Sequence, residues 1–271
     1  MNGLTMDWMN ALQKEIEAFP GTAGVVVRSS SDGVEVSHNA GKIFSSASLI
    51  KLGVLFTLFS KVSSGEIDLD EYVLFDHSVS VEGGLLHRVR SGANLRLDDL
   101  AVLMIAVSDN TAANILIDRL GIDEINSTVH GLGLVDTILG RKMLDFEAKK
   151  RGKDNFTTSG DVSALLEEMH SGSSLPLSLR ERIMEILSLQ KLNFKLPGLI
   201  PVLDVDDVEQ FLAHKTGELP GNEHDAGIFF YHRKKPVIVS VMTEGLQDRS
   251  EGVNFCARIG RIFYDAFCDQ Q

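Results

Sequence analysis

Segments with the pattern of β-strands lie near both ends of this chain, and a helical stretch of about 150 residues separates them. Residues 22–28 and 33–38 are rich in Val and flank a turn of Ser, Asp and Gly, which predicts a hairpin. Strand patterns return only late, at residues 211–217, 227–232 and 236–243. This order favours an α/β fold of the α+β type, in which strands from both chain ends form one antiparallel sheet beside a separate helical lobe. A cleft is expected where the sheet and the lobe meet.

Helical periodicity fills the stretch between these strands. The helices expected there cover residues 49–62, 97–107, 112–120, 160–168 and 179–188. Two more helices, at residues 6–19 and 253–267, lie at the two ends of the chain, and the second has an apolar face that suits packing on the sheet. We therefore expect one discontinuous unit, with an α/β sub-domain from residues 1–45 and 205–271 and a helical sub-domain from residues 46–204.

The 271 residues carry a formal net charge of −12, from 26 basic and 38 acidic side chains. This charge repels polyphosphates and anionic lipid surfaces, so we expect no nucleic-acid partner. An anionic small molecule would need a Lys or Arg placed inside its pocket. No apolar run approaches the roughly 20 residues of a membrane span, and residues 1–19 lack the apolar core of a secretory signal. We expect a monomer that is cytoplasmic, or exported with its signal trimmed.

The cysteines and the late histidines predict neither a disulfide nor a metal site. Cys256 and Cys268 fall in one expected helix, whose rise separates them by roughly 18 Å, well beyond the ~7 Å Cα limit of a disulfide. We therefore expect free thiols. His214, His224 and His232 follow no metal-ligand spacing and are expected to be solvated turn residues. We predict no metal and no cofactor.

The segment Ser46–Lys51 (Ser-Ala-Ser-Leu-Ile-Lys) places a hydroxyl and an amine three residues apart. If a helix starts at Ser48, Ser48 and Lys51 share a face with about 5–6 Å between their Cβ atoms, and the free N–H groups of a helix start can stabilise an oxyanion. A buried Lys of depressed pKa can take the proton of a serine nucleophile. The alternative is a Ser cap followed by an exposed Lys, and a second Ser-x-x-Lys occurs at Ser188–Lys191. The residues around Lys51 are nearly all apolar, which predicts a helix buried all round and favours a functional Lys: Leu49, Ile50, Leu52, Val54, Leu55 and Phe56.

Two further motifs could bring polar groups to the same cleft. Residues 108–110 (Ser-Asp-Asn) join two apolar helices, where a loop can direct a hydroxyl and an amide into a cleft, although these residue types also suit helix caps. Residues 215–217 (Lys-Thr-Gly) lie on the first late strand, where a Gly suits the close approach of a ligand. The alternative for Lys215 is a charge that protects a sheet edge from aggregation.

In this order, Ser48-x-x-Lys51, Ser-Asp-Asn and Lys-Thr-Gly match the three-part signature of the serine β-lactamases and penicillin-binding proteins. The chain resembles the penicillin-recognising serine hydrolases, nearest to the class A β-lactamases, over nearly its whole length. The resemblance implies a β-lactamase/DD-peptidase-like fold with the active site in the cleft. It also implies a small-molecule substrate, a β-lactam or an acyl-D-Ala-like compound, and no cofactor.

The resemblance further implies catalytic roles for individual residues. Ser48 would be the acylated nucleophile and Lys51 its proton acceptor or relay. Ser108 would carry the proton to the leaving nitrogen. The backbone N–H groups of Ser48 and Glu218 would form the oxyanion hole, in which the loss of one donor typically costs about 10²–10³ in rate.

The remaining matched residues would bind the substrate. Asn110 would form a hydrogen bond with its side-chain amide, and Lys215, Thr216 and Gly217 would form the site for its carboxylate. Glu218 is unusual, because this position generally holds a small or polar residue. Its carboxylate could repel anionic substrates or act as a base, and the sequence leaves both roles open.

The loop between the second and third motifs departs from the family pattern. In class A enzymes a loop Glu, shortly after an Arg and shortly before an Asn, activates the water that deacylates the enzyme. Counted from Arg141, that position holds Met143, whose thioether cannot act as a base, and the Asn is also missing. Asp145 or Glu147 could substitute only if the loop follows another path. Without a base, deacylation forfeits a factor of about 10²–10⁴.

Three functions follow as hypotheses. The leading one is a hydrolase that opens β-lactam amides through an acyl-enzyme on Ser48. The first alternative is a DD-peptidase or esterase with the same serine acylation chemistry. The second is a penicillin-binding or sensor protein that is acylated without turnover, which Met143 favours.

Overall fold

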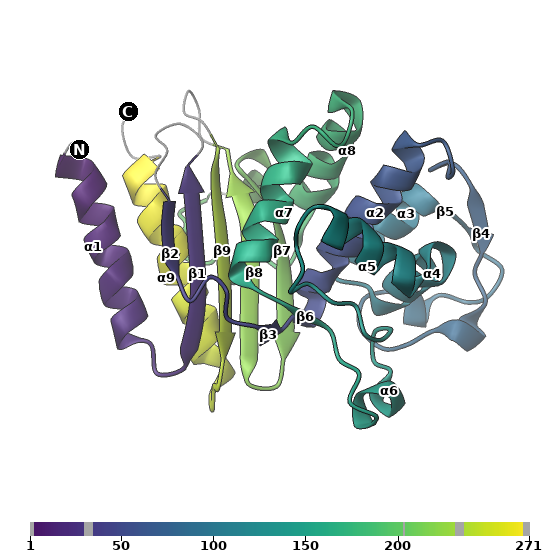
Figure 1. Ribbon diagram of the computed structural model, residues 1–271, viewed down its shortest axis with the longest axis horizontal. Coiled ribbons are helices and arrows are strands. Elements are labelled where there is room, and N and C mark those ends of the chain that lie inside the picture. The colour runs from purple at the N-terminus through teal and green to yellow at the C-terminus, as the bar shows by residue number, and fades with distance from the viewer. Residues whose placement is uncertain (1–2, 30–34, 203, 231–235, 268–271) are drawn as a thin grey trace.

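The protein is described here by a computed structural model that covers residues 3–29, 35–202, 204–230 and 236–267. At its centre is a five-stranded antiparallel sheet in the order β2-β1-β9-β8-β7 (Figure 1). β1 and β2 come from the start of the chain and the other three strands from its end: β1 (Thr22–Ser29), β2 (Glu35–His38), β7 (Leu212–Leu219), β8 (Asn222–Phe229) and β9 (Val237–Glu244). β1 pairs with β9, with Val25 opposite Val241, so the predicted sheet from both chain ends is confirmed.

Helices cover both faces of this sheet. α1 (Gly3–Ala18) and α9 (Arg249–Phe267) pack together over one face, on the left in Figure 1. There the ring of Trp8 meets that of Phe263 edge to face, with 5.4 Å between the centroids. α7 (Ser159–Ser171) packs against β1 and β9 on the opposite face, on the side of the helical lobe. Both faces of the sheet are thus buried, which suits the nearly continuous apolar sequence of its central strands.

The helical lobe holds the remaining elements. Its helices are α2 (Lys51–Ser63), α3 (Leu97–Ala106), α4 (Asn110–Leu120), α5 (Ile122–Gly131), α6 (Phe146–Lys150) and α8 (Leu177–Ser188). Its short strands pair as β3 (Phe44–Ser45) with β6 (Phe156–Thr157) and β4 (Tyr72–Leu74) with β5 (Asn94–Arg96). The 3₁₀ helices are η1 (Ala47–Ile50), η2 (His77–Val79), η3 (Leu86–Arg88) and, before β7, η4 (Val205–Gln210).

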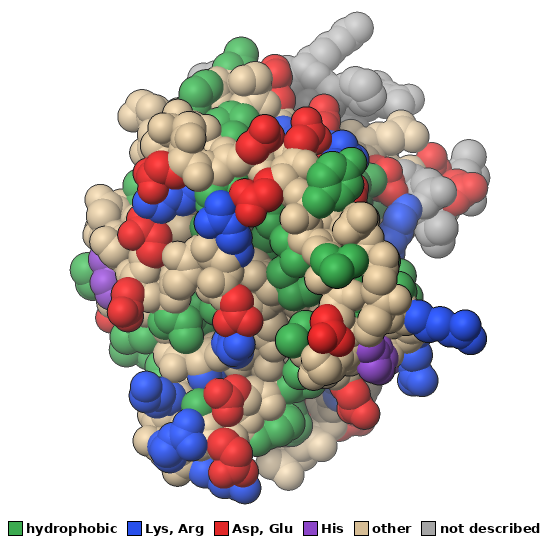
Figure 2. Space-filling model, turned by 90° about the vertical axis from the view of Figure 1, so that its right-hand side faces the viewer, with side chains coloured by type: hydrophobic (Ala, Val, Ile, Leu, Met, Phe, Trp, Pro, Cys, Tyr) green, Lys and Arg blue, Asp and Glu red, His purple; other side chains and the backbone are tan. Residues whose placement is uncertain are grey.

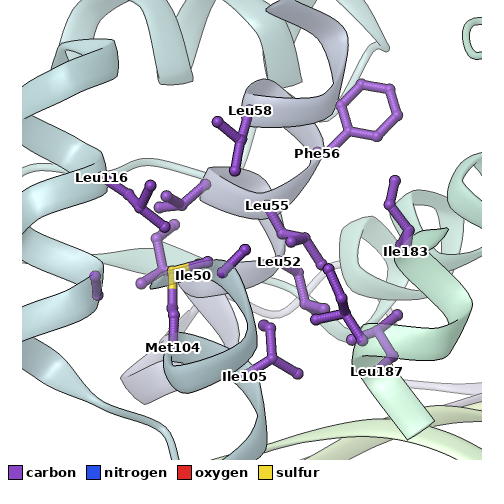
Figure 3. Close-up of a cluster of buried hydrophobic side chains, with 14 of the residues drawn as sticks. Ile50, Leu52, Leu55, Phe56, Leu58, Met104, Ile105, Leu116, Ile183 and Leu187 are labelled. Atoms are coloured by element: carbon purple, nitrogen blue, oxygen red, sulfur yellow. The ribbon is translucent and has the colours of Figure 1, made fainter. Parts of the chain in front are cut away.

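α2 runs through the middle of the lobe and is buried all round, as its apolar sequence predicts. Every residue from Lys51 to Phe59 is buried. Figure 3 shows Leu55 of α2 directed towards α8, where Leu187 lies, and Met104 of α3 on the other side of the helix. Each fully buried Leu or Phe side chain contributes about 1.5–3 kcal/mol. The packing of the whole lobe therefore fixes the helix that carries Lys51.

The bounds of some elements differ from the predictions. β8 begins at Asn222 rather than at residue 227, because the β7–β8 turn contains only Pro220 and Gly221. Gly221 takes the positive φ (+80°) that the residue after Pro requires in a type II turn. Residues 231–232 of the predicted strand lie outside the described residues. α5 and α6 were not predicted. α6 is too short to show helical periodicity, whereas α5 does place Ile122, Ile125 and Val129 at helical spacing, a signal in the sequence that the prediction missed.

The prediction of solvated turn histidines is wrong for two of the three. His214 and His224 are fully buried in β7 and β8. Burial lowers the pKa of the His224 imidazole to about 4, so this ring is neutral at pH 7. His232 lies outside the described residues. Across the described part of the chain, no group of three His, Cys, Asp or Glu side chains could hold a metal ion.

Cys256 is a buried free thiol, and burial raises its pKa. Its predicted counterpart, Cys268, lies outside the described residues. Among the helices of the described ranges, none combines the length and the apolar character that crossing a membrane requires.

Candidate active site

Ser48 and Lys51 lie where the segment after β3 turns into α2. Ser48 belongs to η1, and the α-helix itself begins at Lys51. The N–H of Lys51 donates to the carbonyl of Ser48, which keeps the two residues one turn apart. Ala47, just before Ser48, has a φ of +47°, a left-handed conformation that costs a non-glycine residue about 1–3 kcal/mol. Strain of this kind beside a hydroxyl indicates a functional position.

The connection between α3 and α4 brings Ser108 against Lys51. The Nζ atom of Lys51 donates to the carbonyl oxygen of Ser108 at 2.6 Å, to its Oγ at 3.1 Å and to Oδ1 of Asn110 at 2.8 Å. Ser108 has a φ of +54°, a second strained position at the site. Lys51 is fully buried, so the alternative of an exposed Lys beside a helix cap is wrong.

Burial gives Lys51 an unusual pKa. Desolvation lowers the pKa of its ammonium group to about 7, against the smaller, opposite effect of the Asp109 carboxylate. Near neutral pH a large share of Lys51 is therefore the free amine, whereas an ordinary Lys is almost fully protonated. The amine can accept a proton from a hydroxyl at neutral pH.

β7 brings Lys215 to the same hydroxyl. The Nζ atom of Lys215 donates to Oγ of Ser108 at 3.0 Å and to the carbonyl of Thr216 at 2.7 Å. Lys215 and Thr216 are both buried, so Lys215 is not an exposed charge at a sheet edge. Burial, followed by repulsion from Lys51 and Lys195, holds the pKa of Lys215 well below its usual range. The Ser108 hydroxyl thus lies between two amines whose pKa values are both lowered.

The end of β7 packs directly against η1. A Cβ atom on Gly217 would lie 3.3 Å from the backbone N of Ser48 and 3.2 Å from Cβ of Ala47, a close approach that favours Gly. β7 is the last strand of the sheet, so one of its edges pairs with no other strand of the described residues. Gly217 pairs with His224 of β8. The backbones of Ser48 and Glu218 therefore meet at one corner, where two N–H groups could face the same oxygen.

Asp109 is a structural member of the Ser-Asp-Asn triplet. It is fully buried and caps α4 by accepting the N–H of Ala112 at 2.9 Å. Its second carboxylate oxygen accepts the N–H groups of Leu85 and Leu86 at 2.6 and 2.8 Å. The cap predicted as an alternative for this triplet is therefore present, and it holds the loop that borders Asn110.

Asn110 links Lys51 to that bordering loop. While its Oδ1 accepts from Lys51, its Nδ2 donates to the carbonyl of Glu82 at 2.9 Å. Gly83 follows with a φ of +89°, and a Cβ atom there would lie 2.6 Å from Nδ2 of Asn110. The close contact requires Gly. An amide nitrogen has two N–H donors, so Nδ2 of Asn110 has a second N–H besides the one that Glu82 accepts.

The loop that carries Met143 is fastened at three points. The buried guanidinium of Arg141 forms an ion pair with Asp154 at 2.8 Å. Oδ1 of Asn155 accepts two successive backbone N–H groups at 2.9 and 3.0 Å, the second that of Arg141. Asn114 accepts the N–H of Met143 at 2.7 Å and donates to its carbonyl at 3.1 Å. The backbone of Met143 is thus held from both sides by one side chain.

Around Met143 the loop offers no base to the Lys51–Ser108 cluster. Met143 is 6% exposed and lines a cavity of 300 Å³ together with Asn114 and Asp145. Asp145 caps α6 by accepting the N–H of Ala148 at 2.9 Å. Glu147 is exposed and pairs with Lys150 at 2.7 Å. The structure therefore does not bring either carboxylate to the cluster.

Glu218 has cationic partners instead of a free carboxylate. Its Oε2 lies 2.8 Å from Nη2 of Arg249, and its Oε1 lies 3.7 Å from Nζ of Lys195. Arg249 also pairs with Glu223 at 2.5 Å. Because two cations compensate its charge, both of the roles considered for Glu218, repulsion of anions and a base, lose support.

Four polar residues of this site were not predicted, the buried Asn114, Lys195 and Glu223 and the half-buried Asp154. A signal for two of them is present in the sequence. Asn114 interrupts an apolar helix one turn after Asn110, and Lys195 stands between Phe194 and Leu196 much as Lys51 stands among apolar neighbours. Asp154 and Glu223 have polar neighbours in the sequence, so nothing in the sequence distinguishes them from exposed polar residues.

Known proteins resemble this chain over most of its length. The family model described as "Beta-lactamase enzyme family" matches residues 7–267. A curated protein named Beta-lactamase 1, from Streptomyces cacaoi, is 24% identical over 94% of this chain and 81% of its own length. A β-lactamase from Streptomyces lavendulae is 27% identical over 90% of this chain and 79% of its own length.

Solved structures show the same fold. A β-lactamase from Sphaerobacter thermophilus has a TM-score of 0.83 at 26% identity and covers 96% of both chains. A protein named PBP-A has a TM-score of 0.83 at 25% identity, over 96% of this chain and 95% of its own. A leucine-to-glutamate variant of PBP-A, described as an acyl-enzyme complex with penicillin G, matches equally well.

Proposed function

The chain belongs to the β-lactamase enzyme family, and from this premise we propose that it is a serine hydrolase that opens β-lactam amides through an acyl-enzyme on Ser48. One observation carries the proposal: the Ser108 hydroxyl is held between the amines of Lys51 and Lys215, with Ser48 one turn from Lys51. The β-lactamases from Streptomyces and Sphaerobacter that the chain resembles support the same chemistry.

The geometry supports a specific acylation path. The neutral amine of Lys51 accepts the proton of Ser48 as Oγ attacks the lactam carbonyl, and the carbonyl oxygen takes up negative charge against the N–H groups of Ser48 and Glu218. The C–N bond then breaks. Ser108, which both amines contact, gives its proton to the leaving nitrogen and is re-protonated from the Lys51 side.

Substrate binding would use the groups around this path. The ammonium of Lys215 and the Thr216–Gly217 end of β7 would receive the substrate carboxylate, whose charge favours the protonated form of Lys215. The remaining amide N–H of Asn110 would bind the substrate's side-chain amide. This answers the need of a chain with net charge −12 for local cations.

Slow release is the second candidate, and Met143 favours it. Its thioether replaces the base that would activate the deacylating water, while Asp145 and Glu147 have other partners. The acyl-enzyme would then persist, as in a penicillin-binding or sensor protein. The similarity to PBP-A supports this alternative, since a variant of that protein is described as an acyl-enzyme complex with penicillin G.

The test is intact mass after mixing with penicillin, alongside hydrolysis of a chromogenic cephalosporin. The proposal expects a penicillin adduct on the wild type and no adduct on Ser48→Ala. The matched control is Ser188→Ala, which alters the second Ser-x-x-Lys motif at the end of α8 and should leave the adduct intact.

The outcomes separate the candidates. Turnover of the cephalosporin supports a β-lactamase, and a stable adduct without turnover supports the acylation-only protein. Neither adduct nor turnover, with hydrolysis of a small ester or of an acyl-D-Ala-D-Ala peptide, would support the esterase or DD-peptidase alternative and overturn the leading proposal.

The proposal includes the wider setting of the protein. It acts as a monomer on a small molecule and binds no nucleic acid. Figure 2 supports the expectation of no nucleic-acid partner, because on the face formed by the helical lobe Lys and Arg are interspersed with Asp and Glu rather than gathered in one basic patch. The sub-domain boundaries at residues 46 and 204 and a cytoplasmic or exported location remain predictions from the sequence.

A further inference from the structure

A buried amine lies directly behind the end of β7. Lys195 belongs to the segment 193–196 (Asn-Phe-Lys-Leu), which connects α8 to η4. Its Nζ atom donates to the carbonyl of Gly217 at 2.8 Å and to that of His224 at 3.0 Å, and the residue is fully buried. Oε2 of Glu223 lies 2.7 Å away and supplies the counter-charge. The amine of Lys195 therefore contacts backbone carbonyl groups of the sheet, whereas those of Lys51 and Lys215 contact the Ser108 hydroxyl.

Segment 193–196 is held in this place by several contacts. Oδ1 of Asn193 lies 3.1 Å from Nε2 of His214, and the N–H of Leu196 donates to Asp225 at 3.0 Å. α9 packs closely against this segment, since a Cβ atom on Gly260 would lie only 1.8 Å from the carbonyl oxygen of Leu196. The position of the Lys195 amine is thus set by packing from both sides.

The geometry of the peptide unit connects this amine to the proposed oxyanion hole. The carbonyl of Gly217 and the N–H of Glu218 belong to one planar trans peptide, in which they point in opposite directions. Gly217 pairs with His224, so its carbonyl is directed towards β8, where the amine lies. The N–H of Glu218 is therefore directed to the free edge of β7, beside Ser48. A cation on the carbonyl end also polarises the N–H end, because linked hydrogen bonds strengthen one another.

We propose that Lys195 is a positioning residue for the oxyanion hole: its ammonium binds the carbonyl of Gly217, and so aims and polarises the N–H of Glu218. This proposal rests on the acylation of Ser48 proposed above. Lys195 touches no substrate atom and acts through the peptide unit. Glu223 keeps the charge of Lys195 compensated within the fold.

The test compares Lys195→Met with the matched control Lys191→Met, which removes a half-exposed amine four residues away that pairs with Glu209. Because Lys195→Met leaves Glu223 buried without its partner amine, the double variant Lys195→Met/Glu223→Gln is measured as well. A folded double variant, judged by circular dichroism and its melting curve, should be acylated by penicillin about tenfold more slowly, a part of the 10²–10³ that a whole oxyanion donor supplies. The rate constant is taken at saturating penicillin, so that a change in the dissociation constant through Lys215, whose pKa Lys195 lowers, does not enter it.

Two spectroscopic readouts distinguish positioning from a merely structural role. In the penicillin adduct, the infrared stretch of the ester carbonyl should move to higher wavenumber in the double variant and stay unchanged in Lys191→Met, because the carbonyl loses hydrogen-bond polarisation. Without any substrate, the ¹⁵N resonance of the Glu218 amide should shift in Lys195→Met and in the double variant, and Lys195→Arg should restore it in part.

A folded double variant that is acylated at the wild-type rate, with an unmoved ester band, would overturn the role of Lys195 while the proposed function stands. If the wild type forms no adduct, the proposed function fails instead. The Glu218 resonance then still decides whether Lys195 polarises this peptide, and an unchanged resonance would overturn that.

Discussion

The site has two sides, the Lys51–Ser108–Lys215 cluster and the loop around Met143. The same kind of contact holds both sides in place, but their chemical groups differ. Both are buried and held by side chains that bind backbone groups. Only the first side contains amines whose pKa values burial lowers. The loop is fastened through Asn114 and Arg141, which bind the backbone of Met143 and the carboxylate of Asp154, so these contacts do not use the buried side chain at position 143. The fold of the loop and the presence of a base in it are therefore separable.

The largest effect is expected on the acylation side. Lys51→Met removes the proton acceptor and keeps the length of the side chain, so penicillin acylation should slow by about 10²–10⁴. Stopped-flow mixing with detection of the adduct by mass measures this rate constant. Lys191→Met, in the second Ser-x-x-Lys motif, is the matched control and should acylate normally. Normal acylation of Lys51→Met would remove Lys51 from the mechanism.

The next effect tests the loop. Met143→Glu places a carboxylate where Asn114 holds the backbone, and we expect the lifetime of the penicillin adduct to shorten by about 10²-fold, within the range of a general base. The control is Met143→Gln, which has a similar shape and cannot accept the proton, and its adduct should live as long as that of the wild type. Equal lifetimes for the Glu and Gln variants would show that position 143 does not face the deacylating water.

A smaller effect should appear in the pH profile of acylation. The pKa of Lys51 is lowered to about 7, so below this pH the amine is protonated and cannot take the proton of Ser48. The acylation rate constant should rise about tenfold per pH unit below pH 7 and then level off. Measured from pH 5 to 8, a flat profile, or one that falls as the pH rises, would contradict Lys51 as the acceptor.

The smallest effect separates the fold of the loop from its chemistry. Asn114 and Asn126 each bind one loop residue from both sides, Met143 and Leu139 respectively. Asn114→Ala and Asn126→Ala should each cost about 1–3 kcal/mol of unfolding free energy in urea titrations, because backbone groups lose their partners. Each substitution is then combined with Met143→Glu. The adduct lifetime should return to the wild-type value in Met143→Glu/Asn114→Ala and stay short in Met143→Glu/Asn126→Ala. Equal loss in both double variants would mean that general loosening, and not the position of residue 143, governs release.

Much of this site could be predicted because its motifs are local. Ser48 and Lys51 lie one turn apart in any helical conformation, and the apolar neighbours of Lys51 indicate that it is buried. The β7–β8 region was harder: His224 and Asp225 look like turn residues beside Pro220-Gly221, but the turn takes only two residues and the strand resumes at once. The apolar neighbours of Lys195 indicate its burial, but nothing in the sequence indicates that it pairs with Glu223, because an ion pair between distant residues leaves no periodic pattern.

The amino-acid sequence by itself determined that strands from both chain ends enclose a helical insertion, and that three short motifs supply a serine, two lysines and an amide. Periodicity and residue type suffice for that, since they reflect which faces are buried. Only the tertiary structure decided that Lys51 and Lys215 meet at one hydroxyl, that Gly217 lies against Ser48, and that Asp145, Glu147 and Glu218 have other partners. These contacts join residues far apart in the chain, and the desolvation that lowers the pKa of both lysines exists only once the lobe and the sheet have closed around them.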